Sequence, residues 1–251
     1  MSLFDLTGKV ALVTGSTRGI GLAIARALQA QGAQVVISSE DAADCARVGR
    51  DLGTLAIPAD VADDTQLTAL VDGTIAHHGG LDILVCNAGI TGQAGPFATI
   101  DMADYARVMA INLRSQVVLC NLALPHIAQR GGGSAILIAS LSGLRGNGAI
   151  NAYALAKAGV AQLARNLAVE WGPRAVRVNA LSPGLIRTEL SAPLLANKGF
   201  MARRMQMTPL RRPGEMAEVA GAAVFLASPA GGFVTGHNLV VDGGTLITDG
   251  S

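Results

Sequence analysis

Residues 9–21 read KVALVTGSTRGIG, and this stretch decides the fold. Its first part, Lys9 to Thr14, is rich in the aliphatic and β-branched residues that favour a strand. Its second part places glycines at positions 15, 19 and 21, in the spacing Gly-x-x-x-Gly-x-Gly. Glycines let the backbone turn tightly and approach a ligand with no Cβ atom in the way. A helix that begins there offers free N–H groups and the positive end of its dipole to a phosphate group.

Strand-like and helix-like segments alternate along the rest of the chain. Further strands are expected at residues 34–38, 54–58, 81–86, 135–140, 176–181 and 238–241, and helices at 20–30, 42–52, 65–78, 101–129, 152–171 and 215–227. Because the strands are apolar throughout, we expect helices to cover both faces of the sheet. The pattern predicts an α/β fold with one domain over residues 1–251: a doubly wound, Rossmann-type parallel sheet of about seven strands. A (β/α)₈ barrel also has this length, but a glycine turn after the first strand favours the open sheet.

The composition narrows the classes of function. Of the 251 residues, 50% are hydrophobic and 15% are charged, which excludes a disordered chain. A formal net charge of +1 gives little electrostatic attraction for nucleic acid or an anionic membrane, and an aromatic content of 3% argues against a surface for base stacking. The N-terminal residues lack the pattern of a signal peptide, no apolar run approaches a membrane span of about 18 residues, and the three cysteines have no metal-ligand spacing. We therefore expect a soluble cytoplasmic protein with no metal, nucleic acid or membrane as partner.

Four further motifs follow the glycine turn in order. They are Asp60-Val61, then Asn87-Ala88-Gly89, then the polar set Asn112, Ser140, Tyr153 and Lys157, and finally Pro183-Gly184 with Thr188. With these motifs the chain, from about residue 6 to residue 244, resembles the short-chain dehydrogenase/reductase family. The family often carries a second Asn before Asn-Ala-Gly, where this sequence has Cys86. That position contributes through its backbone, so we expect Cys86 to act as a small buried hydrophobe.

The resemblance implies a nicotinamide cofactor and a set of residues that bind it. Within this set, Asp60 and Val61 contact the adenine, and Pro183, Gly184 and Thr188 flank the nicotinamide. The full set is Gly15, Thr17, Arg18, Gly19, Ile20, Gly21, Ser38, Ser39, Asp60, Val61, Asn87, Ala88, Gly89, Tyr153, Lys157, Pro183, Gly184, Ile186 and Thr188. The catalytic residues implied are Asn112, Ser140, Tyr153 and Lys157.

Tyr153 and Lys157 lie four residues apart in a segment expected to be helical, so both side chains share one face. A free tyrosine has a pKa of about 10, and a nearby ammonium, with the charge of an oxidised nicotinamide, lowers this pKa. Tyr153 is then expected to give a proton to a carbonyl oxygen or to take one from an alcohol. Ser140 ends the fifth strand, where its hydroxyl can hold the same oxygen, and Ser142 is a rival for this role. The resemblance further implies that Lys157 holds the nicotinamide ribose and that Asn112 helps to hold a chain of water molecules.

These residues predict an oxidoreductase that interconverts a ketone and a secondary alcohol by hydride transfer with a nicotinamide cofactor. A 3-oxoacyl-[acyl-carrier-protein] reductase uses the same chemistry, and Arg130 and Arg174 lie near positions where such relatives hold an acidic carrier. A non-catalytic protein that senses the cofactor is an alternative from another class, and a methyltransferase is a third. The intact set of Ser140, Tyr153 and Lys157 favours the enzyme, because neither of the last two alternatives needs it.

The end of the second strand bears on the choice of cofactor. A binder of NAD has an acid there for the ribose hydroxyls, whereas this sequence has Ser38 and Ser39, with Glu40 and Asp41 following. Arg18 in the glycine turn supplies the positive charge that the 2′-phosphate of NADP needs. A carboxylate at Glu40 would repel that phosphate. We expect NADP(H) to be favoured, with NAD(H) as the alternative.

Residues 186–213 interrupt the alternation and, by the same resemblance, are expected to form a lid over the substrate. The Leu, Met and Phe residues of this segment predict a small-molecule substrate with an apolar body. The alternative is that they pack on a neighbouring subunit. Relatives are usually tetramers, and the Ala-rich segment 152–171 with the ending Val240 to Gly244 suits a homotetramer.

Overall fold

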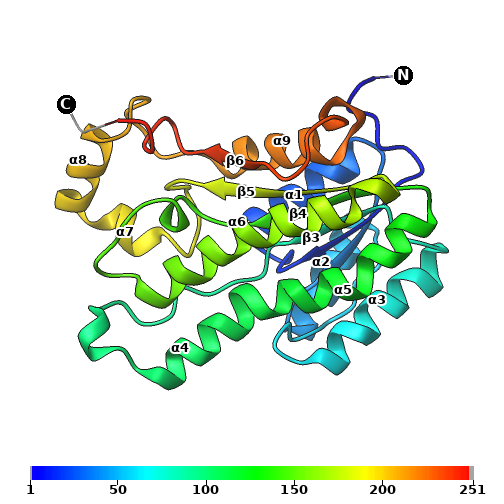
Figure 1. Cartoon of the computed structure of the whole chain (residues 1–251), viewed down its shortest axis with the longest axis horizontal. Helices are drawn as coiled ribbons and strands as arrows, with labels where there is room; N and C mark the ends of the chain where they lie inside the picture. Colours follow the sequence, from blue (N-terminus) through cyan, green and yellow to red (C-terminus); the bar gives the residue numbers. More distant parts are fainter. Residues whose placement is uncertain (1, 249–251) are drawn as a thin grey trace.

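The computed structural model describes residues 2–248, and its central feature is a parallel sheet of six strands (Figure 1). The strands are β1 (Val10–Thr14), β2 (Gln34–Ser38), β3 (Ile83–Cys86), β4 (Gly133–Ile138), β5 (Val176–Pro183) and β6 (Asn238–Val241). Their order across the sheet is β2-β1-β3-β4-β5-β6, and every neighbouring pair is parallel. The chain therefore winds outward from β1 in both directions, as expected for a doubly wound sheet.

The seventh expected strand, residues 54–58, forms only a single bridge, between Ile37 and Ala56. Ile37 donates its N–H to the carbonyl of Leu55 at 2.9 Å, and Ile57 donates to the carbonyl of Ile37 at 2.9 Å. Pro58 follows at once and has no N–H with which to extend the ladder. The prediction of about seven strands is therefore close, and the described residues form six.

Helices cover both faces of the sheet (Figure 1). Each face buries alternate residues of a strand. In β1, Val10 and Leu12 pack in one core while Ala11 and Val13 pack in the other. The first core is closed by α3 (Asp64–His78), α5 (Ser115–Gln129) and α6 (Asn151–Trp171). The second is closed by α1 (Gly19–Ala30), α2 (Ala42–Leu52) and α9 (Met216–Ala227). Apart from α5, these bounds lie within one residue of the expected ones.

The helix expected over residues 101–129 is broken in the middle. It consists of α4 (Met102–Met109), a π turn of five residues (η2, Ala110–Arg114) and α5. By length and composition the stretch Met102–Gln129 could cross a membrane. Its apolar residues Leu119 and Leu124 are instead fully buried on the sheet, as in a core helix of a globular protein.

Short elements complete the described chain. The segment expected as a lid holds two of them, α7 (Ala192–Ala196) and α8 (Lys198–Gln206). The 3₁₀ turns are η1 (Phe97–Thr99), η3 (Leu141–Gly143), η4 (Gly172–Arg174) and η5 (Pro229–Gly231).

Asp82, at the amino edge of the sheet just before β3, joins three segments. Only 2% of it is exposed, and its carboxylate accepts hydrogen bonds from the N–H of Val10 at 3.0 Å, from Arg130 at 3.1 Å and from Lys9 at 3.2 Å. Burial raises the pKa of this carboxyl, but the three hydrogen bonds outweigh burial and hold the pKa below its usual value. The charged form of Asp82 is therefore the one that stabilises the fold.

Asp82→Ala is expected to lower the free energy of unfolding by about 2–4 kcal/mol at pH 7, because Val10 and Arg130 lose their buried acceptor. Since the folded-state pKa is depressed, the contribution of Asp82 is present above the unfolded pKa of about 4 and is lost as the pH falls through the folded pKa. Urea unfolding at pH 7 and at pH 3 measures both effects, and the gap between wild type and variant should narrow at pH 3. The control is Asp44→Ala, which breaks an exposed ion pair with Arg47 and should change stability by less than about 1 kcal/mol. Equal losses in the two variants would contradict the role given to Asp82.

Candidate active site

The carboxyl ends of β1, β3, β4 and β5 lie along one edge of the sheet, and the predicted site residues follow these strands. In open α/β sheets, ligands bind at this edge where the strand order reverses, which here is between β1 and β3. The lid helices α7 and α8 lie on the same side, at the left of Figure 1. The topology therefore gathers the glycine turn, the polar set and the expected lid at one end of the molecule.

The glycine turn packs directly against Asn87 and Ala88, the residues that follow β3. A Cβ atom on Gly15 would lie 2.9 Å from the Cα atom of Ala88, and one on Gly21 would lie 2.2 Å from the carbonyl oxygen of Gly15. Asn87 secures this contact, since its Nδ2 atom donates to the carbonyls of Thr14 at 2.9 Å and Gly15 at 3.0 Å. Two motifs that are far apart in the sequence thus form one unit, which has no room for larger side chains at Gly15 and Gly21.

The start of α1 fits the phosphates of a dinucleotide. Gly19, the first residue of α1, has a φ of 58°, and a Cβ atom there would meet nothing within 4 Å. Within the described chain no side chain caps this helix, and its first turn holds no acidic residue. Its N–H groups and the positive end of its dipole are therefore open to an anion. The hydroxyl of Ser38, at the end of β2, is buried and has no hydrogen-bond partner in residues 2–248, which is the sign of a missing ligand or water.

Ser39 and Asp60-Val61 lie together beside the end of β2. Ala59 donates its N–H to the carbonyl of Ser39 at 2.9 Å, and this bond brings the next two residues to that strand end. The carboxylate of Asp60 accepts a backbone hydrogen bond within its own turn, and Val61 is buried in the core. Ser39 is buried as well and donates its N–H to the Sγ atom of Cys45 at 3.2 Å. The residues that are expected to contact the adenine and the ribose of a cofactor therefore lie close together.

Arg18 and Glu40, the two charged residues that bear on the choice of cofactor, face each other. The Nη2 atom of Arg18 lies 3.7 Å from the Oε1 atom of Glu40, and both side chains are exposed. Such a pair contributes only about 0–1 kcal/mol to stability. It does hold Arg18 beside the end of β2, and it cancels part of the positive charge that a 2′-phosphate would meet.

Ser140, Tyr153 and Lys157 meet at the carboxyl end of β4. Tyr153 and Lys157 both lie on α6, and the Nζ atom of Lys157 is 5.7 Å from the centre of the Tyr153 ring. The hydroxyl of Ser140 lies near enough to Tyr153 to lower the pKa of that tyrosine. Ser142 instead donates its N–H to the Oγ atom of Ser140 at 3.1 Å. The geometry therefore favours Ser140 over Ser142 as the partner of the tyrosine.

Burial dominates the ionisation of Tyr153 and Lys157. Burial raises the pKa of Tyr153, and the hydroxyl of Ser140 offsets this only in part. Lys157 is 3% exposed, donates to the carbonyl of Ile138 at 2.7 Å, and has its pKa lowered by burial to about 8. The expected lowering of the tyrosine pKa is thus absent in the protein alone, because the burial that brings Lys157 close also removes the water that stabilises a phenolate. Further positive charge is needed to produce it.

Asn112 is buried within the π turn, and both polar atoms of its side chain are engaged. Its Oδ1 atom accepts the N–H of Ile90 at 2.8 Å, and its Nδ2 atom donates to the carbonyl of Ile90 at 2.7 Å. A Cβ atom on Gly89 would lie 3.0 Å from the Oδ1 atom of Asn112 and 3.5 Å from the Nζ atom of Lys157. The glycine of the Asn-Ala-Gly motif therefore lies between Asn112 and Lys157, and the Oδ1 and Nδ2 atoms of Asn112 each keep the capacity for one further hydrogen bond.

Cys86, where the sequence departs from the family pattern, lies fully buried at the end of β3. A hydrogen bond with the thiol of Cys120, together with burial, raises the pKa of Cys86 well above its usual value. The thiol thus stays protonated at neutral pH and packs as a small apolar group, as expected.

Backbone hydrogen bonds join the two ends of the expected lid. Ile186 and Gly214 form a bridge, Arg187 donates its N–H to the carbonyl of Gly214 at 2.9 Å, and Gly214 donates to the carbonyl of Leu185 at 2.9 Å. Thr188 is bonded within the lid, with its N–H to the Oγ atom of Ser191 at 3.0 Å. Residues 187–213 therefore form one closed loop between β5 and α9, which leaves and returns at the same point.

Pro183 and Gly184 lie directly before this loop. Pro183 ends β5 in register with Val241 of β6. A Cβ atom on Gly184 would lie 2.7 Å from the Cα atom of Asp242. The glycine thus lets the chain leave the sheet close to the neighbouring strand.

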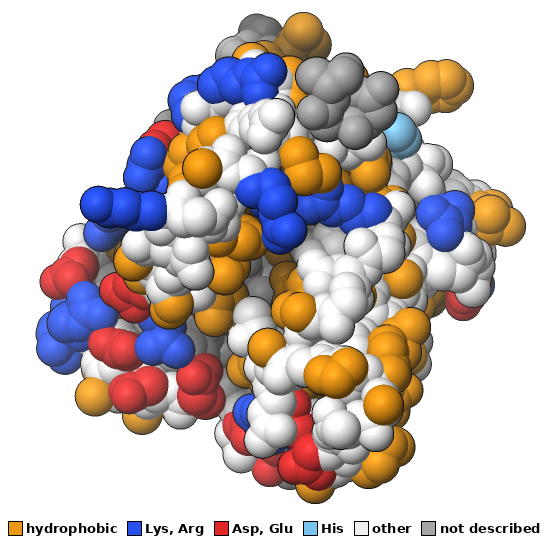
Figure 2. Space-filling view, turned by 90° about the vertical axis from the view of Figure 1, so that its left-hand side faces the viewer, with side chains coloured by type: hydrophobic (Ala, Val, Ile, Leu, Met, Phe, Trp, Pro, Cys, Tyr) orange, Lys and Arg blue, Asp and Glu red, His pale blue; other side chains and the backbone are white. Residues whose placement is uncertain are grey.

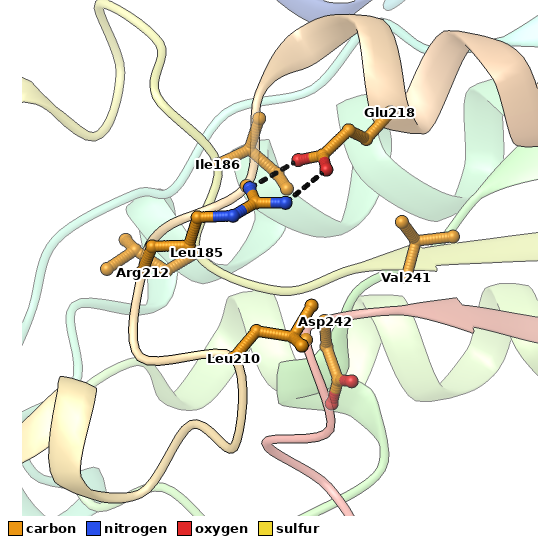
Figure 3. Close-up of a pocket in the computed structure, with 9 residues that line it drawn as sticks. Leu185, Ile186, Leu210, Arg212, Glu218, Val241 and Asp242 are labelled. Atoms are coloured by element: carbon orange, nitrogen blue, oxygen red, sulfur yellow. Dashed lines mark hydrogen bonds and ion pairs between the residues drawn. The ribbon is translucent and has the colours of Figure 1, made fainter.

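A cavity of about 90 Å³ lies beneath the root of the lid (Figure 3). It is lined by Leu185, Ile186, Leu210, Arg212, Gly214, Glu218, Val241, Asp242 and Gly243. Arg212 closes one side through paired hydrogen bonds to Glu218 at 2.8 and 2.5 Å. Pockets for small molecules measure about 300–1,000 Å³. This cavity is therefore a packing gap where the lid joins the body and is too small for a dinucleotide.

Thr14 belongs to the site although no motif singles it out. Its Oγ1 atom accepts the N–H groups of Asn87 at 3.1 Å and of Ala88 at 3.3 Å, so it fixes the two residues that pack on the glycine turn. The sequence could have indicated this role, since Thr14 is the one polar residue of the apolar strand 10–14 and lies at its carboxyl end.

The chain is similar to known proteins along most of its length. Residues 15–245 match a family model described as enoyl-(acyl carrier protein) reductase. Cis-4-hydroxycyclohexanecarboxylate dehydrogenase of Sinomonas cyclohexanicum is 42% identical over 241 residues, which cover 94% of this chain and 96% of the relative. Gluconate 5-dehydrogenase of Burkholderia cenocepacia, solved in complex with NADP and tartrate, is 36% identical, with 98% of each chain covered and a TM-score of 0.93. A 7α-hydroxysteroid dehydrogenase, solved with NADH and 7-oxo glycochenodeoxycholic acid, is 36% identical, with 96% of each chain covered and a TM-score of 0.90.

These relatives agree with the chemistry of the site. They are dehydrogenases named for alcohols, and the two solved structures hold nicotinamide cofactors, NADP in one and NADH in the other. The chain has the same fold, an open cradle for the phosphates of such a cofactor, and Ser140, Tyr153 and Lys157 together beside it. It is therefore an NAD(P)-dependent oxidoreductase that acts on secondary alcohols and ketones, and it belongs to the short-chain dehydrogenase/reductase family.

Proposed function

We propose that this oxidoreductase prefers NADP(H), that Tyr153 is its acid and base, and that Asn112, Ser140 and Lys157 support the tyrosine. The observation that carries the proposal is the buried ammonium of Lys157, which lies on the same helix as Tyr153 and 5.7 Å from the centre of its ring. This group lies at the same edge of the sheet as the open start of α1, whose residues fit the phosphates of the cofactor.

In this mechanism the residues of the chain transfer the proton to or from the substrate oxygen. The nicotinamide cofactor, when bound, supplies or accepts the hydride. In ketone reduction the hydroxyl of Tyr153 donates its proton to the carbonyl oxygen, and in alcohol oxidation the tyrosine oxygen accepts that proton. Ser140 donates a hydrogen bond to the same substrate oxygen and holds it near the phenol. Lys157, protonated below a pKa of about 8, places its charge near the Tyr153 ring, and together with the positive charge of an oxidised cofactor it would make the proton of Tyr153 easier to release.

Tyr153→Phe keeps the ring and removes the hydroxyl, so it is expected to lower kcat by a factor of about 10²–10⁴. Binding of NADPH, followed by nucleotide fluorescence, should stay within about twofold of wild type. The chain has one other tyrosine, Tyr105 on α4, and Tyr105→Phe is the matched control, with an unchanged kcat. A Tyr153→Phe variant that keeps the wild-type rate would overturn the mechanism.

The preference for NADP(H) rests on the groups around the end of β2. Ser38 and Ser39 leave no acid for the ribose hydroxyls at the usual place, and both serines are buried beside the end of β2. Arg18 brings a guanidinium, which pairs with phosphate in a fork geometry. Glu40 opposes this preference, because its carboxylate lies 3.7 Å from the same guanidinium.

Arg18→Ala is expected to weaken NADPH binding at least about tenfold, which is about 1.4 kcal/mol, and to change NADH binding little. Glu40→Gln is expected to act in the opposite direction and to tighten NADPH binding, since it frees Arg18 and removes a repelling charge. Fluorescence titration of both variants with NADPH and NADH at one ionic strength measures these changes. If Glu40→Gln instead weakens NADH and leaves NADPH unchanged, the carboxylate binds the ribose and the preference is for NAD(H).

The substrate proposed is a small ketone or secondary alcohol whose apolar part lies under the lid. Leu190, Leu194 and Leu210 of the lid are exposed and available to such a substrate, or to a neighbouring subunit. The relatives described above act on cis-4-hydroxycyclohexanecarboxylate and on gluconate, so these two alcohols are the first substrates to assay.

The alternative of an acyl-carrier-protein substrate gains no support from the two arginines that suggested it. Arg130 is bonded to the buried carboxylate of Asp82 at 3.1 Å. Arg174 lies over the ring of Trp171, 4.6 Å from its centre. Each side chain thus has a structural partner of its own.

A homotetramer in the cytoplasm is part of the proposal. Val169 on α6 is 82% exposed and Leu155 on the same helix is exposed too, while Phe233 is exposed beside β6, the last strand of the sheet. Exposed apolar residues on regular elements are typical of surfaces that pair with another copy. The three cysteines are free and buried, which suits a reducing compartment.

Light scattering at micromolar concentration is expected to give four times the chain mass of 25.5 kDa. Val169→Glu should lower this mass, because it places a charge in the interface proposed along α6. Asp51→Lys, an exposed change on α2, is the control and should leave the mass unchanged. A wild-type mass of one chain would refute the assembly.

A further inference from the structure

The helix that carries Asn112 is interrupted at that residue by the π turn η2. Ser115 donates its N–H to the carbonyl of Ala110, five residues earlier, where a regular α-helix uses the carbonyl four residues earlier. Such a turn holds one residue more than an α-helical turn, so a return to the regular pitch would rotate Asn112 by about 100° relative to α5. The π turn therefore decides in which direction Asn112 points.

The first turn of α5 supplies two side-chain donors to the carbonyls of this π turn. The Oγ atom of Ser115 donates to the carbonyl of Ile111 at 2.6 Å. The Nε2 atom of Gln116 donates to the carbonyl of Asn112 at 3.0 Å. Bonds from a side chain to a carbonyl four residues earlier compete with the regular helical ladder. Both bonds thus favour the irregular turn, and the bond from Gln116 acts on Asn112 itself.

The polar character of Gln116 is not explained by packing. Figure 2 shows a hollow in the face at the lid end of the molecule, and Gln116, which is 1% exposed, does not line it. The Oε1 atom of Gln116 is buried and has no hydrogen-bond partner in residues 2–248. An unpaired buried amide oxygen costs about 1–3 kcal/mol, and a methionine would fill a similar volume without that cost. The bond from Nε2 to Asn112 is therefore the feature that accounts for an amide at this position.

Asn112 carries the direction of the π turn into the site. Its side chain bonds to both the N–H and the carbonyl of Ile90, at 2.8 and 2.7 Å. Gly89 comes directly before, and a Cβ atom on it would lie 3.0 Å from the Oδ1 atom of Asn112 and 3.5 Å from the Nζ atom of Lys157. A rotation of Asn112 would thus release the backbone that lies against the ammonium of Lys157.

The π turn also packs on the helix of Tyr153 and Lys157. A Cβ atom on Gly159 would lie 2.8 Å from the Cδ2 atom of Leu113, the residue after Asn112. Gly159 follows Lys157 by two residues on α6. The turn is therefore in contact with both segments that surround the lysine, the one after β3 and α6.

We propose that Gln116 is a positioning residue of the reaction. Its amide holds the carbonyl of Asn112, preserves the π turn, and through Asn112 fixes the backbone of residues 89–90 beside Lys157. The proposal rests on the proposed function, because Lys157 acts on turnover through the proton of Tyr153. Since a displacement of about 1 Å far from the chemistry can cost about 100-fold in rate, the loss of this one bond is expected to be visible in kcat.

Hydrogen exchange tests the positioning without any substrate. Gln116→Met keeps the length of the side chain and removes both polar atoms. The amide of Ile90 bonds to Asn112, so it should exchange at least about tenfold faster in this variant. The amide of Ile37, which bonds to the carbonyl of Leu55 in a distant part of the sheet, should change less than about threefold. Unchanged exchange at Ile90, or an equal increase at both amides, would overturn the proposal.

Turnover tests the consequence for the reaction. With NADP⁺ and cis-4-hydroxycyclohexanecarboxylate, kcat of Gln116→Met should fall about 10- to 100-fold, while KM and the binding of NADPH stay within about threefold of wild type. The solvent deuterium isotope effect on kcat should rise, because proton transfer becomes slow relative to hydride transfer. A smaller fraction of folded enzyme would leave that isotope effect unchanged, so an unchanged effect speaks for a structural role alone and against the proposal.

The matched control is Ser115→Ala, which removes the neighbouring bond to Ile111 and leaves the amide of Gln116 in place. Urea unfolding should give the two variants free energies within about 1 kcal/mol of each other. In Ser115→Ala, kcat and the exchange of Ile90 should stay within about threefold of wild type. Equal losses of kcat in the two variants would mean that Gln116 only stabilises the turn, which refutes its role as a positioning residue.

Two further outcomes are decided by the same measurements. If Gln116→Met does not fold, Gln116→Asn replaces it, since its amide is one carbon too short to reach the same carbonyl. If the wild type turns over no alcohol, or if Tyr153→Phe keeps the full rate, the proposed reaction fails, and the exchange of Ile90 still shows whether Gln116 holds Asn112. If Tyr153→Phe is inactive and Gln116→Met is as fast as wild type, the reaction stands and the role of Gln116 is refuted.

Discussion

The site depends on the close contact between the glycine turn and the residues that follow β3. Asn87 bonds to the carbonyls of Thr14 and Gly15, and Gly21 leaves no space for a Cβ atom beneath them. This contact fixes the turn that leads into α1, whose first N–H groups have no side-chain cap within the described residues. It also directs the chain toward Gly89, which lies against Asn112 and Lys157. The cofactor cradle and the proton-transfer group are thus built on one packing contact at the switch point of the sheet.

Burial of Tyr153 and Lys157 disfavours the charged forms that proton transfer needs. Only the carbonyl of Ile138 and the side chain of Ser140 compensate within the chain. A lysine with a pKa of about 8 still carries its charge at pH 7, but at a cost that a solvated lysine would not incur. Strongly shifted ionisation of this kind is typical of functional sites.

The arginines at the root of the lid, where residues 185–187 and 212–214 join it to the rest of the molecule, have acidic partners. At the root, Arg187 and Arg212 pair with Glu215 and Glu218 at the start of α9, and backbone bonds between Leu185 and Gly214 close the loop. The two ends of the lid are therefore held to the rest of the molecule by ion pairs and backbone hydrogen bonds.

Local patterns in the sequence determined the alternation of strands and helices, the glycine turn and the shared face of Tyr153 and Lys157, because each depends on neighbours within about one turn or one strand. The strand expected at 54–58 was lost for a reason also visible in the sequence, since Pro58 cannot extend a ladder. Other properties depend on segments far apart in the chain. The raised pKa of Tyr153 follows from burial, and Asn87 bonds to the carbonyls of Thr14 and Gly15 because β1 and β3 are neighbours. Burial and long-range proximity are set by how the layers pack, and only the tertiary structure decides them.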